Sequence, residues 1–200
     1  MTVATTVGAV GRALDSLGCS WALVGGLAVS LRSQPRFTRD TDFAVAVGND
    51  REAEGIVRGL VQRGYVLVSS IDQIDVARLA AVRLSLPGDA SGEASIDVIS
   101  AFSGIEPEIV ADAERLTVVP GTIAPVAKIG HLIATKIVSE GENRVHDARD
   151  LQWLIEVADN EEIARARQGL ALSESRGFHA GKDLQATLDQ YLARAGRPSA

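Results

Sequence analysis

Apolar positions in the first part of the chain follow two different periods. Over residues 7–17 they recur at helical spacing and stop before Gly18, which predicts an amphipathic helix that ends at this glycine. The run WALV at 21–24 is short, apolar and closed by two glycines, so it predicts a buried strand that enters a tight turn. A short helix is then expected over 27–31, because the residue ahead of Pro35 disfavours helix.

The middle of the chain alternates between strand and helix patterns, whereas the later part is helical. Strands are predicted at 41–47, 65–68, 77–86 and 94–99, and a helix capped by Asn49 and Asp50 is predicted at 51–63. The polar stretch 87–93 predicts a hairpin connection between the last two strands. Beyond Pro120 the strand signals vanish, and helices are expected near 125–139, 144–158, 160–169 and 180–195.

These elements predict an α/β fold in which a mixed sheet is flanked by helices and followed by a C-terminal helical bundle. The expected division is a sheet-bearing half at 1–120 and a helical half at 121–200. A chain of 200 residues is long enough to bury a real core as one domain. Hydrophobic residues make up 46% of the chain but aromatic ones only 4%, so aliphatic side chains must fill that core.

Composition and charge narrow the class of protein. The single cysteine, Cys19, excludes a disulfide framework and a cysteine-based zinc site, and agrees with a reducing cytoplasm. The sequence shows neither a leader pattern nor an apolar run of membrane-spanning length, so we expect a cytoplasmic protein with no membrane partner. A net charge of −6 argues against an indiscriminate attraction to nucleic acid.

Local basic patches are still compatible with this net charge. One group surrounds the candidate active site described next, and a second lies in the helical half, where it could equally be solvated surface charge. The first group is Arg32, Arg36 and Arg39; the second is Arg144, Arg149, Arg165 and Arg167.

Two carboxylates on one strand give the strongest chemical signal. Successive side chains of a strand alternate between faces, so Asp40 and Asp42 point the same way, with about 7 Å of backbone between them at roughly 3.3 Å per residue. Such a pair repels itself unless a cation is present, and carboxylate oxygens are natural ligands of Mg²⁺. An arbitrary Asp-x-Asp is usually a solvated strand end, and its context must decide.

The context is a glycine turn that precedes the pair. Gly25 and Gly26 follow a strand and open a short helix, at a distance that can bring the turn back beside Asp40 and Asp42. Backbone N–H groups at such a turn and helix start form an anion site that can take a triphosphate. The glycine turn and the carboxylate pair together predict a nucleotide site with a bridging metal.

A third carboxylate lies in the segment ASIDVIS. Asp97 alternates with apolar Ile96 and Val98, so it faces away from them. If its strand neighbours the Asp40 strand, Asp97 can complete the metal ligands or act as general base on an acceptor hydroxyl. The alternative is an edge-strand acid that faces solvent.

The helical half contributes a lysine and two acids. Lys136 lies on the apolar face of its predicted helix, where it needs an anionic partner, either a structural acid or a bound phosphate. Asp147 and Asp150 are one helical turn apart and border a packed surface, so either can pair with Lys136. Alternatively, they only favour the start of their helix through its dipole.

Three segments carry a resemblance to a known family: WALVGGLAVSLRSQPRFTRDTDFAV, SIDVIS and LIATKIVSEGENRVHDARDL. Together, over roughly residues 1–160, they resemble the nucleotidyltransferase superfamily and specifically its AbiEii-like toxin branch, which includes mycobacterial tRNA-modifying toxins. The resemblance implies that Asp40 and Asp42 bind Mg²⁺ or Mn²⁺ and that Lys136 contacts nucleotide phosphate. It also implies that Asp147 or Asp150 is a late catalytic acid.

The predicted site therefore combines three groups of residues. Catalytic roles are expected for Asp40, Asp42, Asp97, Lys136, Asp147 and Asp150; metal binding for Asp40, Asp42 and Asp97; and nucleotide binding for Gly25, Gly26, Arg39 and Lys136. One departure from the family pattern is Gly26, where many members have a serine whose hydroxyl contacts phosphate.

Three functions follow as hypotheses. The first is a toxin that transfers a nucleoside monophosphate from an NTP to the 3′ end of tRNA, paired with a cognate antitoxin, in which the helical half closes the nucleotide cleft. The second is transfer to a small molecule such as an aminoglycoside, or to a protein side chain, which the net charge favours. The third is a catalytically silent binding module, against which the set of Asp40, Asp42, Asp97 and Lys136 argues.

Overall fold

A mixed β-sheet forms the centre of the sheet-bearing half of the molecule. The structure is a computed structural model that describes residues 2–38, 40–73, 78–89, 95–140 and 145–197. Within these residues seven strands form one sheet in the order β3-β4-β5-β2-β1-β7-β6. The strands are β1 (Trp21–Val24), β2 (Thr41–Val45), β3 (Val66–Gln73), β4 (Arg78–Ser85), β5 (Ser95–Ile99), β6 (Glu114–Val119) and β7 (Thr122–Val126).

The sheet is mixed because its central strands pair in both directions. β2 runs antiparallel to β1 but parallel to β5, and β1 runs parallel to β7. The outer pairs β3–β4, β4–β5 and β6–β7 are antiparallel. The middle of the sheet is fully buried, with Leu23, Phe43 and Ile96 at 0% exposure, which explains the nearly continuous apolar runs of these strands.

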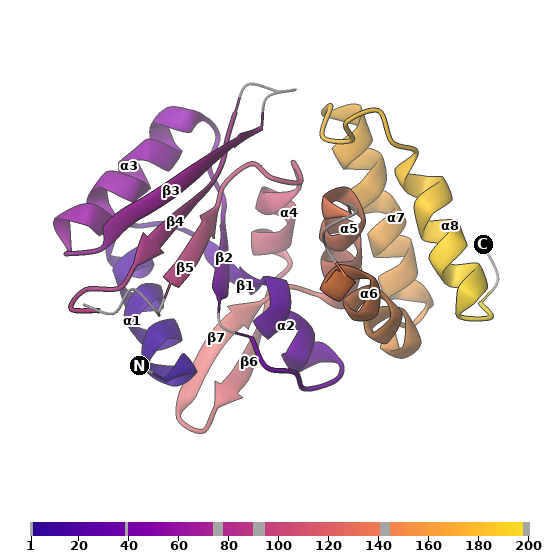
Figure 1. Cartoon of the computed structure of the whole chain (residues 1–200), viewed down its shortest axis with the longest axis horizontal. Helices are drawn as coiled ribbons and strands as arrows, with labels where there is room; N and C mark the ends of the chain where they lie inside the picture. The colour runs from indigo at the N-terminus through magenta and orange to yellow at the C-terminus, as the bar shows by residue number, and fades with distance from the viewer. Residues whose placement is uncertain (1, 39, 74–77, 90–94, 141–144, 198–200) are drawn as a thin grey trace.

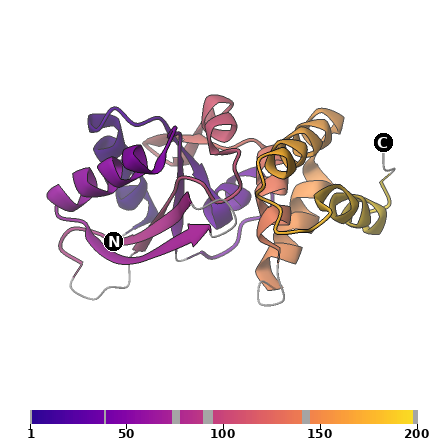
Figure 2. The ribbon, with the colours of Figure 1, turned by 90° about the horizontal axis from the view of Figure 1, so that it is seen from above.

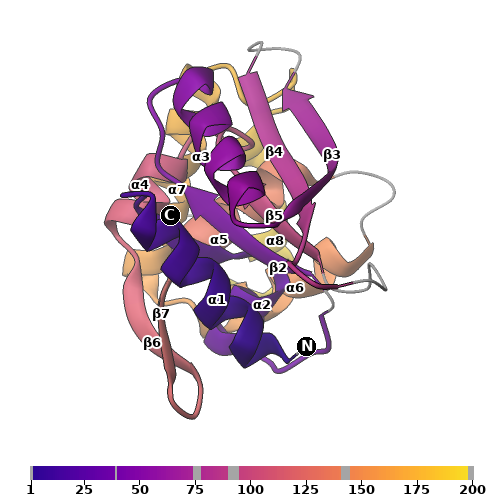
Figure 3. The ribbon, with the colours of Figure 1, turned by 90° about the vertical axis from the view of Figure 1, so that its left-hand side faces the viewer.

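Helices cover both faces of the sheet, and a helical bundle lies to one side (Figure 1). The helices are α1 (Val3–Ser16), α2 (Gly25–Arg32), α3 (Asp50–Gln62), α4 (Glu106–Ala111), α5 (Ile129–Ser139), α6 (Val145–Val157), α7 (Asn160–Ser175) and α8 (Leu184–Arg194). α1 and α3 lie together over one face of the sheet (Figure 3), whereas α2 and α4 lie between the sheet and the bundle of α5 to α8. The two chain ends lie on opposite sides of the molecule (Figure 2).

Local sequence explains where several helices begin and end. The Thr2 hydroxyl and the Thr5 side chain form a capping box at the start of α1, and the Asn49 side chain accepts the Glu52 N–H at the start of α3. Gly18, which follows α1, has a positive φ of 70°, a conformation in which a side chain would be strained.

The α/β fold is confirmed, and so are the predicted helix before Gly18, the strand at 21–24 and the cap at Asn49. The strand predicted at 65–68 continues to Gln73, and the helix predicted at 160–169 continues to Ser175. Part of the connection predicted at 87–93 and the first residue of the helix predicted at 144–158 lie outside the described residues.

The prediction that strands end at Pro120 is wrong. β7 follows this proline and pairs with both β6 and β1, so the sheet extends past the predicted division at residue 120. The helix expected near 125–139 accordingly begins only at Ile129. β6 and α4 were not predicted at all. β7 was not predicted because its alternation of polar and apolar residues is short and weak and is interrupted by Pro125. Its pairing with β1, more than ninety positions earlier in the chain, stabilises it as a strand although its local strand propensity is low.

Candidate active site

The parallel pairing of β2 with β5 brings the predicted carboxylates together. Asp42 and Asp97 are direct partners in this pairing, and Asp40 lies immediately ahead of β2. The condition for a role of Asp97, that its strand neighbours the strand that follows Asp40, is therefore met. Three acids from two segments more than fifty positions apart share one region of the sheet.

The Gly25–Gly26 turn packs directly against Asp42. A Cβ atom on Gly25 would lie 1.8 Å from Asp42 Oδ2, and Gly25 has a positive φ of 62°. Any side chain at this position would therefore be strained and would also displace the carboxylate. The turn has to contain glycine here so that backbone and carboxylate can meet.

Asp42 is held in an environment that disfavours its charge. Burial, followed by the charges of Asp97 and Asp40, raises the pKa of Asp42 to about 7, although Lys136 and a hydrogen bond from the Gly26 N–H act in the opposite direction. A nearby cation would therefore stabilise the charged form of Asp42.

Arg83 is a functional candidate that the sequence reading missed. Its Nε and Nη2 atoms donate to the two oxygens of Asp97 at 2.8 and 2.7 Å, and Nη2 lies 3.7 Å from Asp40 Oδ2. The hydrogen bonds with Asp97 are the main cause that raises the pKa of Arg83. The register between β4 and β5 could have revealed Arg83 as a site residue, because Arg83 on β4 is the direct partner of Asp97 on β5.

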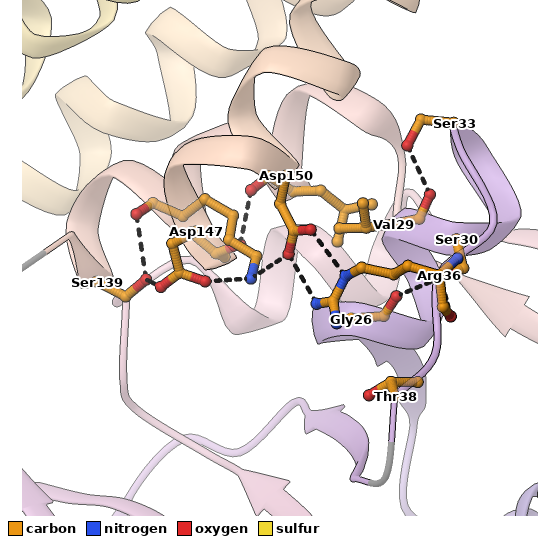
Figure 4. A network of polar contacts seen from close by, with 12 residues as sticks. Gly26, Val29, Ser30, Ser33, Arg36, Thr38, Ser139, Asp147 and Asp150 are labelled. Carbon is orange, nitrogen blue, oxygen red and sulfur yellow. Dashed lines mark hydrogen bonds and ion pairs between the residues drawn. The ribbon is translucent and has the colours of Figure 1, made fainter. Parts of the chain in front are cut away.

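A buried ionic network joins the sheet-bearing half to the helical half (Figure 4). Lys136 Nζ lies 2.5 Å from Asp147 Oδ1 and 2.8 Å from Asp150 Oδ2, so both acids pair with it. Arg36 donates to the two oxygens of Asp150 at 2.8 and 2.9 Å, from the loop between α2 and β2. The Asp150 side chain is 0% exposed. Ser139 contacts Asp147 at 3.4 Å.

The loop of Arg36 also packs on the glycine turn. A Cβ atom on Gly26 would lie 2.5 Å from Arg36 Nη2 and 3.1 Å from Thr38 Oγ1. Glycine at position 26, where many family members have serine, thus leaves the space that the Arg36 guanidinium group occupies. Arg36 was predicted as part of a basic patch around the candidate site, and its pairing with Asp150 was not foreseen.

One cavity of about 340 Å³ connects these groups. It is lined by six of the predicted site residues, namely Gly25, Gly26, Asp40, Asp42, Asp97 and Lys136. Asp147 and Asp150 do not line it but contact residues that do, among them Lys136 and Arg36, and Arg39 lies outside the described residues. The volume is within the range of small-molecule and cofactor sites.

A glycine turn, converging carboxylates and a lysine around one cavity are what nucleotidyl transfer needs, and the comparison with protein families agrees. The family described as nucleotidyl transferase AbiEii toxin, type IV toxin–antitoxin system, matches residues 10–197. The chain belongs to this family. It is therefore a nucleotidyltransferase of the AbiEii toxin family, as the resemblance implied.

Solved structures share the nucleotidyltransferase fold of this chain. An antigenic nucleotidyltransferase-like protein from Paracoccidioides brasiliensis is 22% identical, with a TM-score of 0.52 over 92% of this chain and 91% of that one. The ANT(2″)-Ia structure in complex with adenylyl-2″-tobramycin is 14% identical, with a TM-score of 0.54 over 88% of this chain and 99% of that one. No curated protein matches the chain by sequence comparison.

Nucleotidyltransferases of this kind generally use an NTP and divalent metals. Asp40 and Asp42 fit such an ion, because the two carboxylates lie beside the glycine turn and the charge of Asp42 is disfavoured by burial and then by Asp97 and Asp40. Among the described residues, no group of three or more histidine, cysteine, aspartate or glutamate side chains is arranged to hold a metal. Asp97 would have to leave Arg83 to become a third ligand.

Within the described ranges, no helix is both long and apolar enough to cross a bilayer.

Proposed function

We propose that this AbiEii nucleotidyltransferase transfers a nucleoside monophosphate from an NTP to the 3′ end of tRNA with the help of Mg²⁺. The observation that carries the transfer chemistry is the contact of the Gly25–Gly26 turn with Asp42, inside a cavity that Lys136 also lines. Phosphate, metal and a positive charge would meet there.

Each group of residues around the cavity would have a separate role in this reaction. Asp40 and Asp42 would hold Mg²⁺ or Mn²⁺, which when bound neutralises phosphate charge and makes the α-phosphate more electrophilic. Backbone N–H groups at the glycine turn would orient the triphosphate, and Lys136 would bind a phosphate oxygen. Such positioning and charge stabilisation account for most catalysis of phosphoryl transfer.

Asp147 and Asp150 would act as positioning residues. Both contact Lys136, neither lines the cavity, and Asp150 is also fixed by Arg36. They would hold the lysine Nζ at the cavity wall when no phosphate is present. Asp97, paired with Arg83, would serve as general base or third metal ligand once the acceptor displaces that arginine.

An exposed aromatic side chain favours a single-stranded nucleic acid as the acceptor. Phe37 is 83% exposed, while the other seven aromatic side chains, all in the described part of the chain, are buried or half-buried. Its neighbours in the chain, Arg36 and Thr38, both line the cavity, so Phe37 belongs to the loop that borders it. Unpaired bases at an RNA end can stack on such a ring.

A small-molecule acceptor is the second candidate. The net charge of −6 favours a cationic acceptor over RNA. The ANT(2″)-Ia structure, which contains adenylyl-2″-tobramycin, shares the fold. An aminoglycoside therefore belongs in the same assay as tRNA.

The family assignment also supports a partner and a compartment. Because the family is described as part of type IV toxin–antitoxin systems, we propose a cognate antitoxin that counteracts the activity. Acceptor tRNA and NTP are both cytoplasmic, and we propose that compartment for the protein.

Incubation with each α-³²P-labelled NTP, Mg²⁺ and total tRNA tests this proposal. Label on tRNA is expected with the unchanged chain and with Asp189→Asn, a control far from the cavity, but not with Asp42→Asn. Parallel reactions contain tobramycin or no added acceptor. Label on tobramycin alone would establish the second candidate, label on the protein alone would indicate self-modification, and no label anywhere would refute nucleotidyl transfer to these acceptors.

A further inference from the structure

A buried carboxylate outside the catalytic group lines the same cavity. Glu106 begins α4, which lies between the sheet and the helical bundle (Figure 1), and is only 2% exposed. Its Oε1 atom accepts hydrogen bonds from the Phe102 N–H, the Ser103 N–H and the Ser103 hydroxyl, at 3.1, 2.7 and 2.7 Å. Its Oε2 atom is buried and has no hydrogen-bond partner.

Such an atom is unusual, because buried polar atoms in folded proteins are nearly always paired. Glu106 lines the cavity that also contains Gly25 and Asp42, so a ligand in this cavity is the available source of a donor. The surrounding wall includes Ile99, Phe102 and Ile109, which offer apolar surface to a flat, uncharged ring. A hydrogen-bond donor carried by a planar, largely apolar group would fit both the unpaired oxygen and this wall.

We propose that Glu106 Oε2 accepts a hydrogen bond from the exocyclic amino group of the donor nucleotide's base. This inference rests on the proposed nucleotidyl transfer and adds a specificity-determining residue to it. Bases that carry an amino group, namely cytosine, adenine and guanine, would be favoured over uracil. A carboxylate that accepts from a base amino group is a known mode of base reading.

The neighbouring donors cannot serve a base that presents a carbonyl oxygen instead. The N–H groups of Phe102 and Ser103 both point at Glu106 Oε1. O4 of uracil beside Oε2 would place two acceptors together and leave both unpaired. Sites that pair with a polar group of the correct substrate discriminate strongly against analogues that lack it.

The segment that holds Glu106 is fixed from the helical bundle, so it cannot easily rearrange to accept a carbonyl. The buried Ser173 hydroxyl on α7 donates to the Ser103 carbonyl oxygen at 2.7 Å. Arg176, just after α7, donates to the Gly104 carbonyl oxygen. Gly104 itself packs against the Phe178 ring, where an added Cβ would lie 2.4 Å from the nearest ring carbon.

Binding of non-reactive nucleotides to the full chain tests the inference without any turnover. The probes are the α,β-methylene analogues of CTP and UTP, measured by titration calorimetry with Mg²⁺ present. The matched pair of ATP and ITP analogues, which differ by an amino group and a carbonyl at one ring position, is measured in the same way. We expect at least tenfold tighter binding of the amino-bearing member of each pair.

Glu106→Gln should remove or reverse this preference, because the Phe102 and Ser103 N–H groups hold its amide oxygen and leave the amide NH2, a donor, facing the base. Glu108→Gln is the control: Glu108 lies two positions further along α4, pairs with Arg176 and does not line the cavity. It should leave both ratios unchanged. Melting curves establish that both variants are folded. The comparison between the two nucleotides of each pair in the unchanged chain tests the preference without any variant.

The possible results separate this inference from the proposed function. Equal binding within both pairs, or a preference that persists in folded Glu106→Gln, would overturn the role of Glu106 and leave nucleotidyl transfer intact. Absence of binding by every nucleotide would overturn both. Tobramycin binding that Glu106→Gln abolishes, with nucleotide ratios unchanged, would overturn the base-reading role and assign Glu106 to an acceptor amine.

Discussion

Replacing Asp42 with asparagine should make the metal-free protein more stable while it removes activity. The pKa of Asp42 is raised to about 7, first by burial and then by the charges of Asp97 and Asp40. In the unfolded chain the same group ionises near pH 4. The folded state therefore pays a penalty for the charged carboxylate, which asparagine avoids with nearly the same shape.

The sign and the size of the effect follow from this difference. A carboxyl group with a raised pKa in the folded state costs no stability below about pH 4, and its full cost appears once the pH exceeds about 7. Three pH units correspond to about 4 kcal/mol, and relaxation of the site reduces this to about 2 kcal/mol or more. For a chain of this length that is a rise in Tm of at least roughly 4 °C.

Thermal unfolding in EDTA at pH 4.5, 6 and 8 measures the effect. The gain of Asp42→Asn over the unchanged chain should grow with pH, whereas Asp189→Asn, which loses a half-buried pair with Arg167, should show no gain at any pH. Added Mg²⁺ should stabilise the unchanged chain and narrow the gap. A variant that is no more stable at pH 8, or equally stabilised at every pH, would refute the electrostatic reasoning.

Four other substitutions or reactions test separate parts of the site. Gly25→Ala should reduce turnover more than a hundredfold and lower Tm, because its Cβ would overlap the Asp42 carboxylate; kinetics and melting that match the unchanged chain would contradict this. Asp150→Asn should cost about 3–5 kcal/mol in urea unfolding, since the half-buried cations Arg36 and Lys136 lose the charge of the fully buried acid that they share. Arg83→Gln should lower the Mg²⁺ concentration needed for half-maximal thermal stabilisation if Asp97 is a third ligand, and an unchanged value would remove Asp97 from the metal site. Burial, followed by the charge of Asp15, raises the pKa of Cys19 to about 11. The Cys19 thiol should therefore react with iodoacetamide at pH 8 on the order of a hundredfold more slowly than free cysteine.

The sequence predicted best what depends on neighbouring residues. The turn at Gly25, the strand of Asp42 and the apolar strand of Asp97 each carry a local pattern, and the structure places them side by side. The pairing of Lys136 with an acid on the next helix was also predictable, because an inward lysine requires a counter-charge.

The features that could not be predicted from the sequence depend on contacts between residues that are far apart in the chain. Arg83 and Asp97 are opposed only because β4 pairs with β5 in one register, and a shift of one residue would place them on opposite faces. β7 is stabilised by β1 and β6 rather than by its own residues. Glu106 looks like an ordinary acid of a short helix until its burial and its unpaired oxygen are known.

The link between Arg36 and Asp150 has a consequence for protein synthesis. The two residues are 114 positions apart, yet together with Lys136 they form one buried network at the cavity. While a ribosome is still making the chain, every residue that lines the cavity is synthesised before α6, which supplies the acids that anchor the lysine and the arginine. A growing chain thus carries the cavity before it carries Asp150, and its Lys136 and Arg36 gain their shared buried partner only when α6 is complete.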